Sequence, residues 1–368
     1  MASPTRSRNR RPLPAKMLIG YGTNCDRVRK AVHDGVNIVI WAFMDIVAVD
    51  NEHEDSDHRE LLESQTDTDT PRRGRIKTDL DLNGIRQLIQ ELDQNGYNHV
   101  IHLVSFGGWN GPHLDAALSA EEWYDCWKES EAGSLFHGMD WDLEGHDDLT
   151  RPTNVFTIEC LEKMGHISRM MKEDGYLVGM APPQSYMNFD NPHLSRYVNL
   201  TEPDRPWHSE FHYFGANVYS YVLAKYGDFI DFVSMQLYES YSLAAMAVYH
   251  ENIEPEDYLI SYIQDLVVKQ KEKFYVDFSQ DKDLNMEGQY THLPLKKLVI
   301  GLANGWAADP ENRKHIFIAP EQIQKAYNAL QNSDHGDLSP RGFMFWTIEE
   351  EGTRDVYLAR DIHKTLNP

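Results

Sequence analysis

Eight short apolar runs separated by longer amphipathic stretches constrain the fold of this chain more than any other feature of its sequence. Several of the runs are apolar on both faces, as at 36–43, and strands that are buried on both sides have this pattern. We therefore expect eight strands, at Met17–Tyr21, Val36–Phe43, Val100–Phe106, Phe136–Glu144, Tyr176–Ala181, Phe232–Tyr238, Leu298–Ala303 and Gly342–Thr347.

The stretches between the runs have helical periodicity, for example Leu82–Asn95 and Val155–Asp174. Gly175 follows the second of these at the place of a helix C-cap. Eight strands alternating with helices favour an α/β fold with a single (β/α)8 barrel of the TIM type, and a doubly wound sheet is the alternative. We expect the barrel to occupy residues 17–368, after a basic segment at 1–16.

Three connections after strands are longer than a minimal barrel needs. Segment 45–75 is acidic and polar, and we expect a solvated loop there. Segments 182–231 and 239–297 are long enough to hold small subdomains or walls of a substrate site. Connections that follow strands lie at the C-terminal face of a barrel, where active sites are built.

The fourth run carries acidic residues at alternate positions, Asp140, Asp142 and Glu144. Side chains alternate along a strand, so these three share one face, and in a barrel that face is the interior. Burying three carboxyl groups in a row is costly unless they share protons or perform a task. The alternative is an exposed edge strand with solvated acids, but the place of this run among two-sided apolar strands favours catalysis.

The order along the strand also ranks the three acids. Asp140 lies deepest, and Glu144 lies at the carboxyl end, where barrel active sites are assembled. Like charges at this spacing retain a proton and raise at least one carboxyl pKa. A raised pKa suits a general acid that protonates a leaving oxygen near neutral pH.

The acidic run resembles the D-G-x-D-x-D-x-E signature of glycoside hydrolase family 18, the chitinases and their relatives. Motifs similar to those of the third, fifth, sixth and eighth strands of that family follow in the same order, at Val104–Gly111, Gly179–Pro182, Ser234–Tyr238 and Gly342–Thr347. The resemblance spans about residues 17–365, and four ordered motifs beyond the first argue against chance agreement.

The resemblance implies hydrolysis of β-1,4 bonds in chitin or chito-oligosaccharides, with Glu144 as the general acid and then the base. Asp142 would orient the substrate's N-acetyl group, whose carbonyl oxygen attacks the anomeric carbon to give an oxazolinium intermediate. Asp140 would share a proton with Asp142. Tyr238 would hydrogen-bond the acetamido oxygen, and Trp346 would form the floor beneath the distorted sugar. Because the substrate supplies its own nucleophile, no metal or cofactor is required.

Further candidates for substrate binding come from the matched motifs and from tryptophans near the ends of predicted strands: Gln236, Met180, Gly107, Gly108, Trp109, Trp41 and Trp306. The apolar face of a sugar ring stacks on aromatic rings, which favours the tryptophans as a group. For any single tryptophan, core packing is the alternative. The glycine pair fits either a close approach of the backbone or a plain turn.

Three residues depart from the family pattern. The family has Asp or Asn in place of His137, a smaller aliphatic residue in place of Trp141, and Asp or Asn in place of Glu239. We expect His137 to point with Trp141 away from the acids and to change helix packing. Glu239 is a longer acid near the reaction centre, and we expect it to shift the pKa of Glu144 or to narrow the pocket.

A metal site is an alternative interpretation of His137, His146, Asp147 and Asp148. Adjacent acids on a loop are more often a helix N-terminal turn or a solvated bend, so we expect no metal. The sequence has no H-E-x-x-H spacing, no phosphate-binding glycine loop after a strand, and no G-x-S-x-G elbow.

The net charge of −23, from 58 acidic and 35 basic residues, argues against nucleic-acid and membrane partners, because such a surface repels phosphates and anionic lipids. No apolar stretch approaches the roughly 20 residues of a membrane span. The sequence carries no indication of an oligomeric state.

Cys25, Cys126 and Cys160 are widely separated and odd in number, so they offer no disulfide framework and suit a reducing compartment. Segment 1–16 is basic and has no apolar core, so it is not a secretory signal as written. A targeting arm and a disordered tail are both open, and we expect the tail. These features favour a cytoplasmic or other intracellular location, although most chitin lies outside cells.

Two other functions stay open on the same barrel. One is a non-catalytic protein that binds chito-oligosaccharides, but such relatives usually lack the catalytic acid, and this chain keeps Glu144. The other is an endo-β-N-acetylglucosaminidase that acts on N-glycans. The long segments 183–230 and 239–296 would decide which substrate fits.

Overall fold

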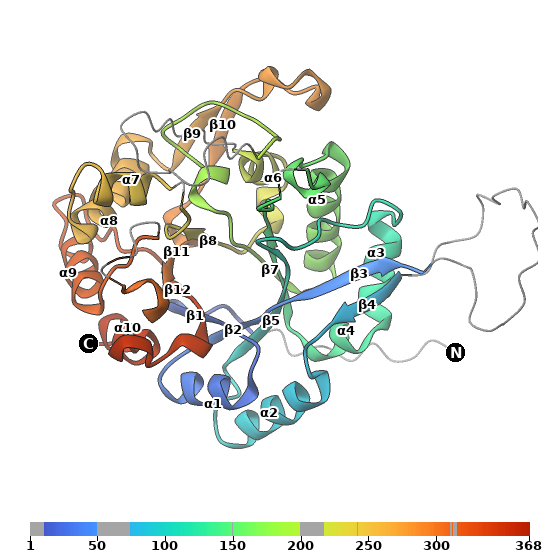
Figure 1. Cartoon of the computed structure of the whole chain (residues 1–368), viewed down its shortest axis with the longest axis horizontal. Helices are drawn as coiled ribbons and strands as arrows, with labels where there is room; N and C mark the ends of the chain where they lie inside the picture. Colours follow the sequence, from blue (N-terminus) through green and yellow to red (C-terminus); the bar gives the residue numbers. More distant parts are fainter. Residues whose placement is uncertain are drawn as a thin grey trace, which may run out of the picture.

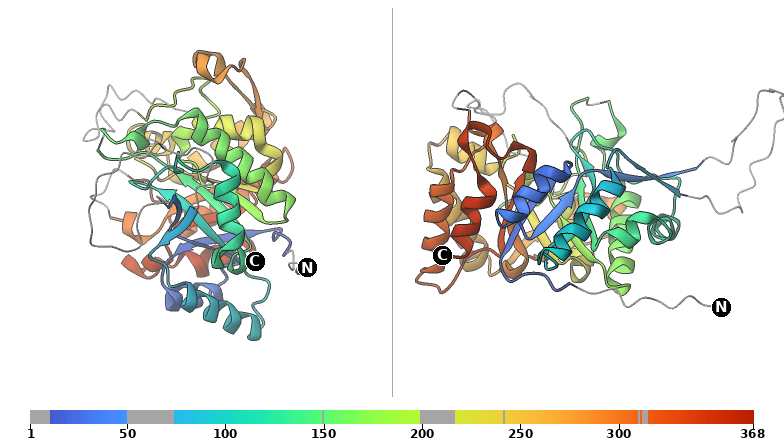
Figure 2. Two further views of the ribbon diagram at one scale, coloured as in Figure 1. Left: turned by 90° about the vertical axis from the view of Figure 1, so that its right-hand side faces the viewer. Right: turned by 90° about the horizontal axis from the view of Figure 1, so that it is seen from below.

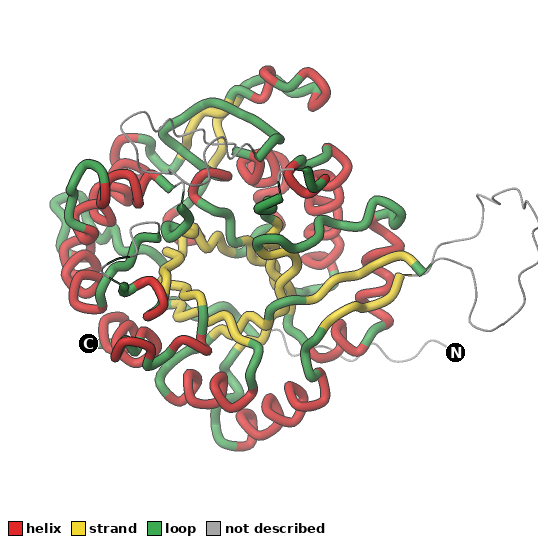
Figure 3. Tube along the Cα trace, in the orientation of Figure 1, coloured by secondary structure: helices red, strands yellow, loops and turns green. Residues whose placement is uncertain are grey.

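The computed structural model describes residues 11–49, 74–148, 150–198, 217–240, 242–309, 311 and 315–368. Eight parallel strands close into a barrel, which Figure 3 shows as a ring of strands enclosed by helices. They are β1 (Met17–Gly22), β2 (Ile38–Trp41), β5 (Ile101–Gly108), β6 (Gly138–Leu143), β7 (Leu177–Met180), β8 (Phe232–Gln236), β11 (Leu298–Ala303) and β12 (Gly342–Trp346). The predicted (β/α)8 barrel is confirmed, and each strand lies within or across its predicted run.

Helices follow the barrel strands and surround the ring (Figure 1). They are α1 (Cys25–His33), α2 (Leu82–Gln94), α3 (Ala120–Glu129), α4 (Glu131–Leu135), α5 (Ile158–Glu173), α6 (Val218–Tyr226), α7 (Leu243–Tyr249), α8 (Pro255–Gln264), α9 (Pro320–Gln331) and α10 (Leu358–Leu366). The two helices expected from periodicity, α2 and α5, are confirmed, and Gly175 follows α5 with a φ of 85°. Among the described residues, no helix has the length and apolarity to cross a membrane.

The acidic connection after β2 differs from its prediction. Its two described ends form an antiparallel ribbon, β3 (Met44–Ala48) and β4 (Gly74–Thr78), which projects beyond the barrel in Figures 1 and 2. We expected a solvated loop over 45–75, which was wrong at both ends, and 50–73 lies outside the described residues. Met44 and Ile46, two residues apart on β3, are both buried. This alternation of buried residues is short, and it is hard to recognise in a sequence segment that is rich in acidic residues.

The connection after β8 contains structure of its own, as expected for a small subdomain. It includes α7, α8 and a second antiparallel ribbon, β9 (Lys273–Val276) and β10 (Gln289–His292). The connection after β7 is described only in part, because 199–216 lie outside the described residues. Cys25, Cys126 and Cys160 are free thiols.

We expected a disordered tail at the N-terminus. Over its described part, 11–16, this basic segment instead contacts the closed end of the barrel, which is the end opposite the carboxyl ends of the strands. The Arg11 guanidinium forms an ion pair with Asp93 at 3.0 Å, and the Lys16 ammonium donates to the backbone carbonyl of Leu366. Leu13 packs against the apolar cluster inside the barrel. The sequence alone did not reveal that these cations have partners in the folded chain.

His137 also lies at this closed end, one residue before β6. Its Nδ1 accepts from the backbone N–H of His102 at 3.0 Å, and the two rings stack with centroids 6.2 Å apart. Burial and then the nearby Arg11 lower the pKa of His137 to about 4. The expectation that His137 points away from the acids is correct, and its neighbours are His102, Arg11 of the N-terminal segment and Asp93 of α2.

The outer face of β6 is held by helix α5. Met139, Trp141 and Leu143 are buried in the layer between strands and helices. The Trp141 indole N–H donates to the Ser168 hydroxyl on α5 at 2.9 Å. Because side chains alternate along the strand, fixing this face also fixes the direction of the opposite one.

We predict that Ser168→Ala destabilises the fold by about 1–3 kcal/mol, because it leaves the buried Trp141 N–H without an acceptor. Urea unfolding monitored by circular dichroism measures the change. Ser134→Ala, on the exposed side of α4, is the matched control and should change stability by less than about 0.5 kcal/mol. Equal stabilities of the two variants would contradict the prediction.

Candidate active site

The row of acids on β6 lies inside the barrel, as the alternation predicts. Asp140 and Asp142 are 0% and 3% exposed. Glu144 follows the last residue of β6 and is partly exposed. The row therefore runs from the sealed interior to the mouth of the barrel.

Asp140 is fixed by two hydroxyl groups. Its Oδ2 accepts from the Tyr21 hydroxyl at 2.5 Å and from the Ser105 hydroxyl at 3.2 Å. Burial raises the pKa of Asp140 to about 7, against the opposing effect of these two hydrogen bonds. We expected Asp140 to share a proton with Asp142, but in the described structure its hydrogen-bond partners are Tyr21 and Ser105, and its Oδ1 has none.

Asp142 and Glu144 are neighbouring carboxyl groups whose ionisations affect each other. Burial, and then the charges of Glu144 and Asp140, raise the pKa of Asp142 well above its ordinary value. Burial raises the pKa of Glu144 to about 7. Because both pKa values are raised, the two groups do not ionise together below neutral pH, and the pair retains a proton there.

Gln236 orients the pair from strand β8. Its Nε2 donates to Asp142 Oδ1 at 2.8 Å and to the carbonyl oxygen of Ala181 at 2.6 Å, and lies 3.4 Å from Glu144 Oε1. The carbonyl bond fixes the orientation of the amide, so that its second N–H faces the carboxyl pair.

The backbone around Glu144 is held by side chains from three different loops and helices. His113 Nε2 lies 2.8 Å from the Glu144 carbonyl oxygen and must be the protonated nitrogen to donate there. The Tyr219 hydroxyl donates to the carbonyl of Leu143, and the N–H of Gly145 donates to the Tyr186 hydroxyl, both at 3.0 Å. The carboxyl group of Glu144 therefore extends from a fixed position.

Glu239, which departs from the family pattern, lies half-buried after β8. Its carboxylate accepts from the backbone N–H of Ser185 at 2.5 Å and from the Ser185 hydroxyl at 2.9 Å. Burial raises the pKa of Glu239 to about 8, and the charge of Glu144 contributes in the same direction. The pKa of Glu144 is set by burial, Gln236 and Asp142, so the shift that we expected Glu239 to cause there is not found.

Aromatic rings surround the mouth. The ring of Trp346 packs against Tyr21 and Phe43, with centroid distances of 5.4 and 5.7 Å. Trp306 stands perpendicular to Tyr238 at 6.4 Å, and its N–H donates to the Trp346 carbonyl at 2.8 Å. Burial, then the charges of Asp142 and Glu144, raise the pKa of Tyr238, which keeps its hydroxyl protonated.

Gly107 and Gly108, at the end of β5, permit close contacts that a side chain would block. Both have positive φ angles, 111° and 85°. A Cβ at Gly107 would lie 2.5 Å from the Asp142 carbonyl oxygen, and one at Gly108 would lie 2.6 Å from the Phe43 ring. Their role here is to bring the backbone of β5 and the Phe43 ring against the site, as expected for a close approach.

Two of the predicted substrate-binding residues are elsewhere. Trp41 is fully buried between strand β2 and the helices, and its N–H is 3.3 Å from His102 Nδ1. Met180 is buried in the same outer layer. Their immediate neighbours along the strands, Ile40 and Ala181, are the residues that face the barrel interior. The prediction that Trp41 and Met180 line the site was therefore wrong.

Sequence reasoning missed several residues that contact the site: Tyr21, Phe43, Ser105, His113, Ser185, Tyr186 and Tyr219. Tyr21 and Ser105 carry a weak signal, because each is a polar group near the end of an apolar strand. The contacts of Tyr186 and Tyr219 come from the connection after β7, whose sequence has no pattern that points to β6.

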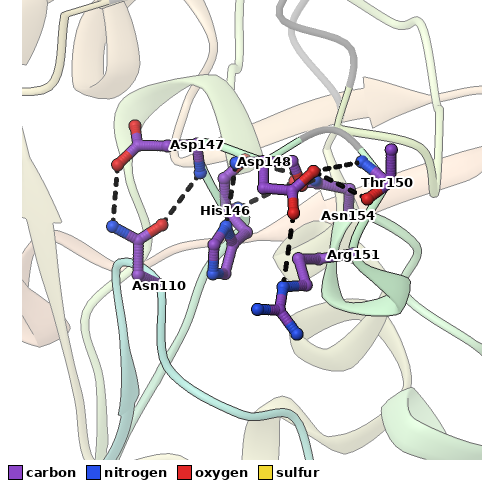
Figure 4. A network of polar contacts seen from close by, with 7 residues as sticks. All are labelled: Asn110, His146, Asp147, Asp148, Thr150, Arg151 and Asn154. Carbon is purple, nitrogen blue, oxygen red and sulfur yellow. Dashed lines mark hydrogen bonds and ion pairs between the residues drawn. The ribbon is translucent and has the colours of Figure 1, made fainter.

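The residues of the alternative metal site lie at opposite ends of β6, since His137 precedes the strand and His146 to Asp148 follow it. In Figure 4 the acids of the second group face other partners, Asp147 toward Asn110 and Asp148 toward Thr150 and Arg151. Among the described residues, no three His, Cys, Asp or Glu side chains are placed to hold a metal ion.

No protein-family model and no curated protein matches the chain. Solved structures do. A family 18 chitinase from Chromobacterium violaceum has a TM-score of 0.59 and 14% sequence identity, and the match covers 98% of this chain and 86% of the chitinase. The C-terminal domain of Legionella pneumophila ChiA has a TM-score of 0.53 and 16% identity, over 95% of this chain and 96% of that domain. The chain therefore has the chitinase-like barrel fold of glycoside hydrolase family 18.

Proposed function

We propose that this protein is a retaining glycoside hydrolase that cleaves β-1,4 bonds in chitin or chito-oligosaccharides. The observation that carries the proposal is the arrangement of buried Asp142 and partly exposed Glu144, both in contact with the Gln236 amide at the mouth of the barrel. A carboxylic acid with a pKa of about 7, partly exposed beside aromatic rings, suits protonation of a glycosidic oxygen. We assign residues 17–368 to this catalytic unit.

In the first step, Glu144 gives its proton to the oxygen of the leaving sugar as the glycosidic bond breaks. The acetamido oxygen of the substrate forms the new bond to the anomeric carbon, and the product is an oxazolinium ion. Asp142 accepts from the acetamido N–H and stabilises the positive charge, and the hydroxyl of Tyr238 donates to the acetamido oxygen. Trp346 supports the apolar face of the sugar.

In the second step, Glu144 is a carboxylate and removes a proton from water. The water oxygen attacks the anomeric carbon from the face that the leaving group vacated, and the bond to the acetamido oxygen breaks. The configuration at the anomeric carbon is retained, and Glu144 is protonated again. Asp140 acts behind this pair as a buried acid whose charge, after burial and the charge of Glu144, helps to raise the pKa of Asp142.

We predict that Glu144→Gln lowers kcat on a chromogenic chitotriose derivative by about 10²–10⁴-fold, because glutamine cannot transfer a proton. Glu349→Gln is the matched control. That carboxyl group lies on the same face of the barrel but accepts from Thr23 and Asn24, so activity should stay within about twofold.

Equal rates for wild type and Glu144→Gln would remove Glu144 from the mechanism. Saturable binding of an oligosaccharide that stays intact over days would favour the non-catalytic alternative. Release of glycans from a high-mannose glycoprotein, with chitohexaose left uncut, would favour the N-glycan enzyme.

We also predict that kcat/KM falls above pH about 7, by about tenfold per pH unit. Glu144 must be protonated to act as the acid, and its raised pKa keeps it so up to neutral pH. Measuring kcat/KM from pH 4 to 10, on a substrate whose leaving group does not titrate, tests this decrease. A rate that keeps rising between pH 7 and 9 would contradict the assignment of Glu144 as the acid.

A further inference from the structure

Trp109 is an exposed tryptophan beside the catalytic strand. It follows Gly108, which pairs with Leu143 on β6, so Trp109 and Glu144 extend from neighbouring positions on neighbouring strands. The side chain is 39% exposed. Within the described part of the chain no other aromatic ring packs on its indole, and the polar edge of the indole makes a hydrogen bond.

That contact is a hydrogen bond to Asp147. The Trp109 indole N–H donates to Asp147 Oδ1 at 3.0 Å, while Asn110 Nδ2 donates to Asp147 Oδ2 at 2.7 Å. In return, the backbone N–H of Asp147 donates to Asn110 Oδ1 at 2.8 Å, and Figure 4 shows the two side chains face to face. The carboxylate thus uses both oxygens on the two residues that follow Gly108.

The same two loops are also joined through the backbone. The N–H of Asn110 donates to the carbonyl oxygen of Gly145 at 3.1 Å. Asp147 lies three residues after Glu144, so its carboxylate fastens the Trp109 indole to the loop that continues the catalytic strand. The position of the indole is therefore set relative to Glu144 rather than relative to β5 alone.

An indole held in this way can serve as a platform for a sugar ring. The apolar face of a sugar packs against an aromatic ring, and a ring that is already held loses less conformational entropy when the sugar binds. A substrate gains from such a platform only if it is long enough to reach both the platform and the acid.

We propose that Asp147 is a positioning residue that holds Trp109 as a stacking platform for a sugar unit near the cleaved bond, and that it thereby increases the preference for longer chito-oligosaccharides. This inference rests on the proposed chitinase function. A carboxylate suits this role best, because the two donors bind its two separate oxygens and asparagine has only one oxygen.

The first test compares chitotriose and chitohexaose. In Asp147→Ala, the ratio of kcat/KM for the hexamer to that for the trimer should fall about three- to tenfold, through KM, while kcat at saturating hexamer stays within about twofold. Asp147→Asn should fall between wild type and Asp147→Ala. Asp148→Ala is the matched control, because its carboxylate faces Thr150 and Arg151, and it should keep the wild-type ratio. An unchanged ratio in Asp147→Ala would overturn the proposal.

A double-mutant cycle tests whether Asp147 acts through Trp109. Trp109→Ala should lose the same length preference, and the double variant Asp147→Ala/Trp109→Ala should be no worse than Trp109→Ala alone. Additive losses would overturn the proposal, because Asp147 would then act by another route.

A third measurement separates this inference from the proposed function. The indole N–H resonance of Trp109, assigned with Trp109→Phe, should move in Asp147→Ala and stay in place in Asp148→Ala. In the Glu144→Gln background, calorimetry should show about three- to tenfold weaker binding of chitohexaose when Asp147 is alanine. A wild-type protein without turnover contradicts the proposed function only. An unmoved resonance or unchanged binding overturns the role of Asp147.

Discussion

The burial of Asp140 and Asp142 along the inner face of β6, with Glu144 directly after the strand, is the constraint on which the rest of the site depends. An ionised carboxylate in the interior is unfavourable unless hydrogen bonds or shared protons compensate. Asp140 has Tyr21 and Ser105, and the Asp142–Glu144 pair has its shared proton and Gln236. The inside of the barrel is consequently apolar at the closed end and polar toward the mouth.

The opposite face of β6 supplies the rigidity that this arrangement needs. Trp141 and its neighbours lie in the close-packed layer under α3 and α5, so the strand cannot rotate to release the acids into solvent. Beyond the strand, His113, Tyr186 and Tyr219 hold the backbone on either side of Glu144. The acids of the site are thus supported both by their own strand and by the surrounding loops.

The sequence predicted the barrel well because every barrel strand is buried on both sides and therefore stands out as an apolar run. The same property hid which face of each strand points inward. The sequence indicated which face of β6 points inward because that face is acidic. Strands β2 and β7 are apolar on both faces and carry no such indication, so Trp41 and Met180 were assigned to the wrong side. Contacts between distant segments were also beyond reach, since Tyr21 and Asp140 are 119 residues apart.

The two ends of the barrel differ in what they leave accessible. Residues 11–16 and the last turn of α10 meet at the end opposite the acids, where the Lys16 ammonium donates to the Leu366 carbonyl. A support or fusion partner attached through the C-terminus would therefore sit behind the barrel and leave the mouth facing away from the attachment.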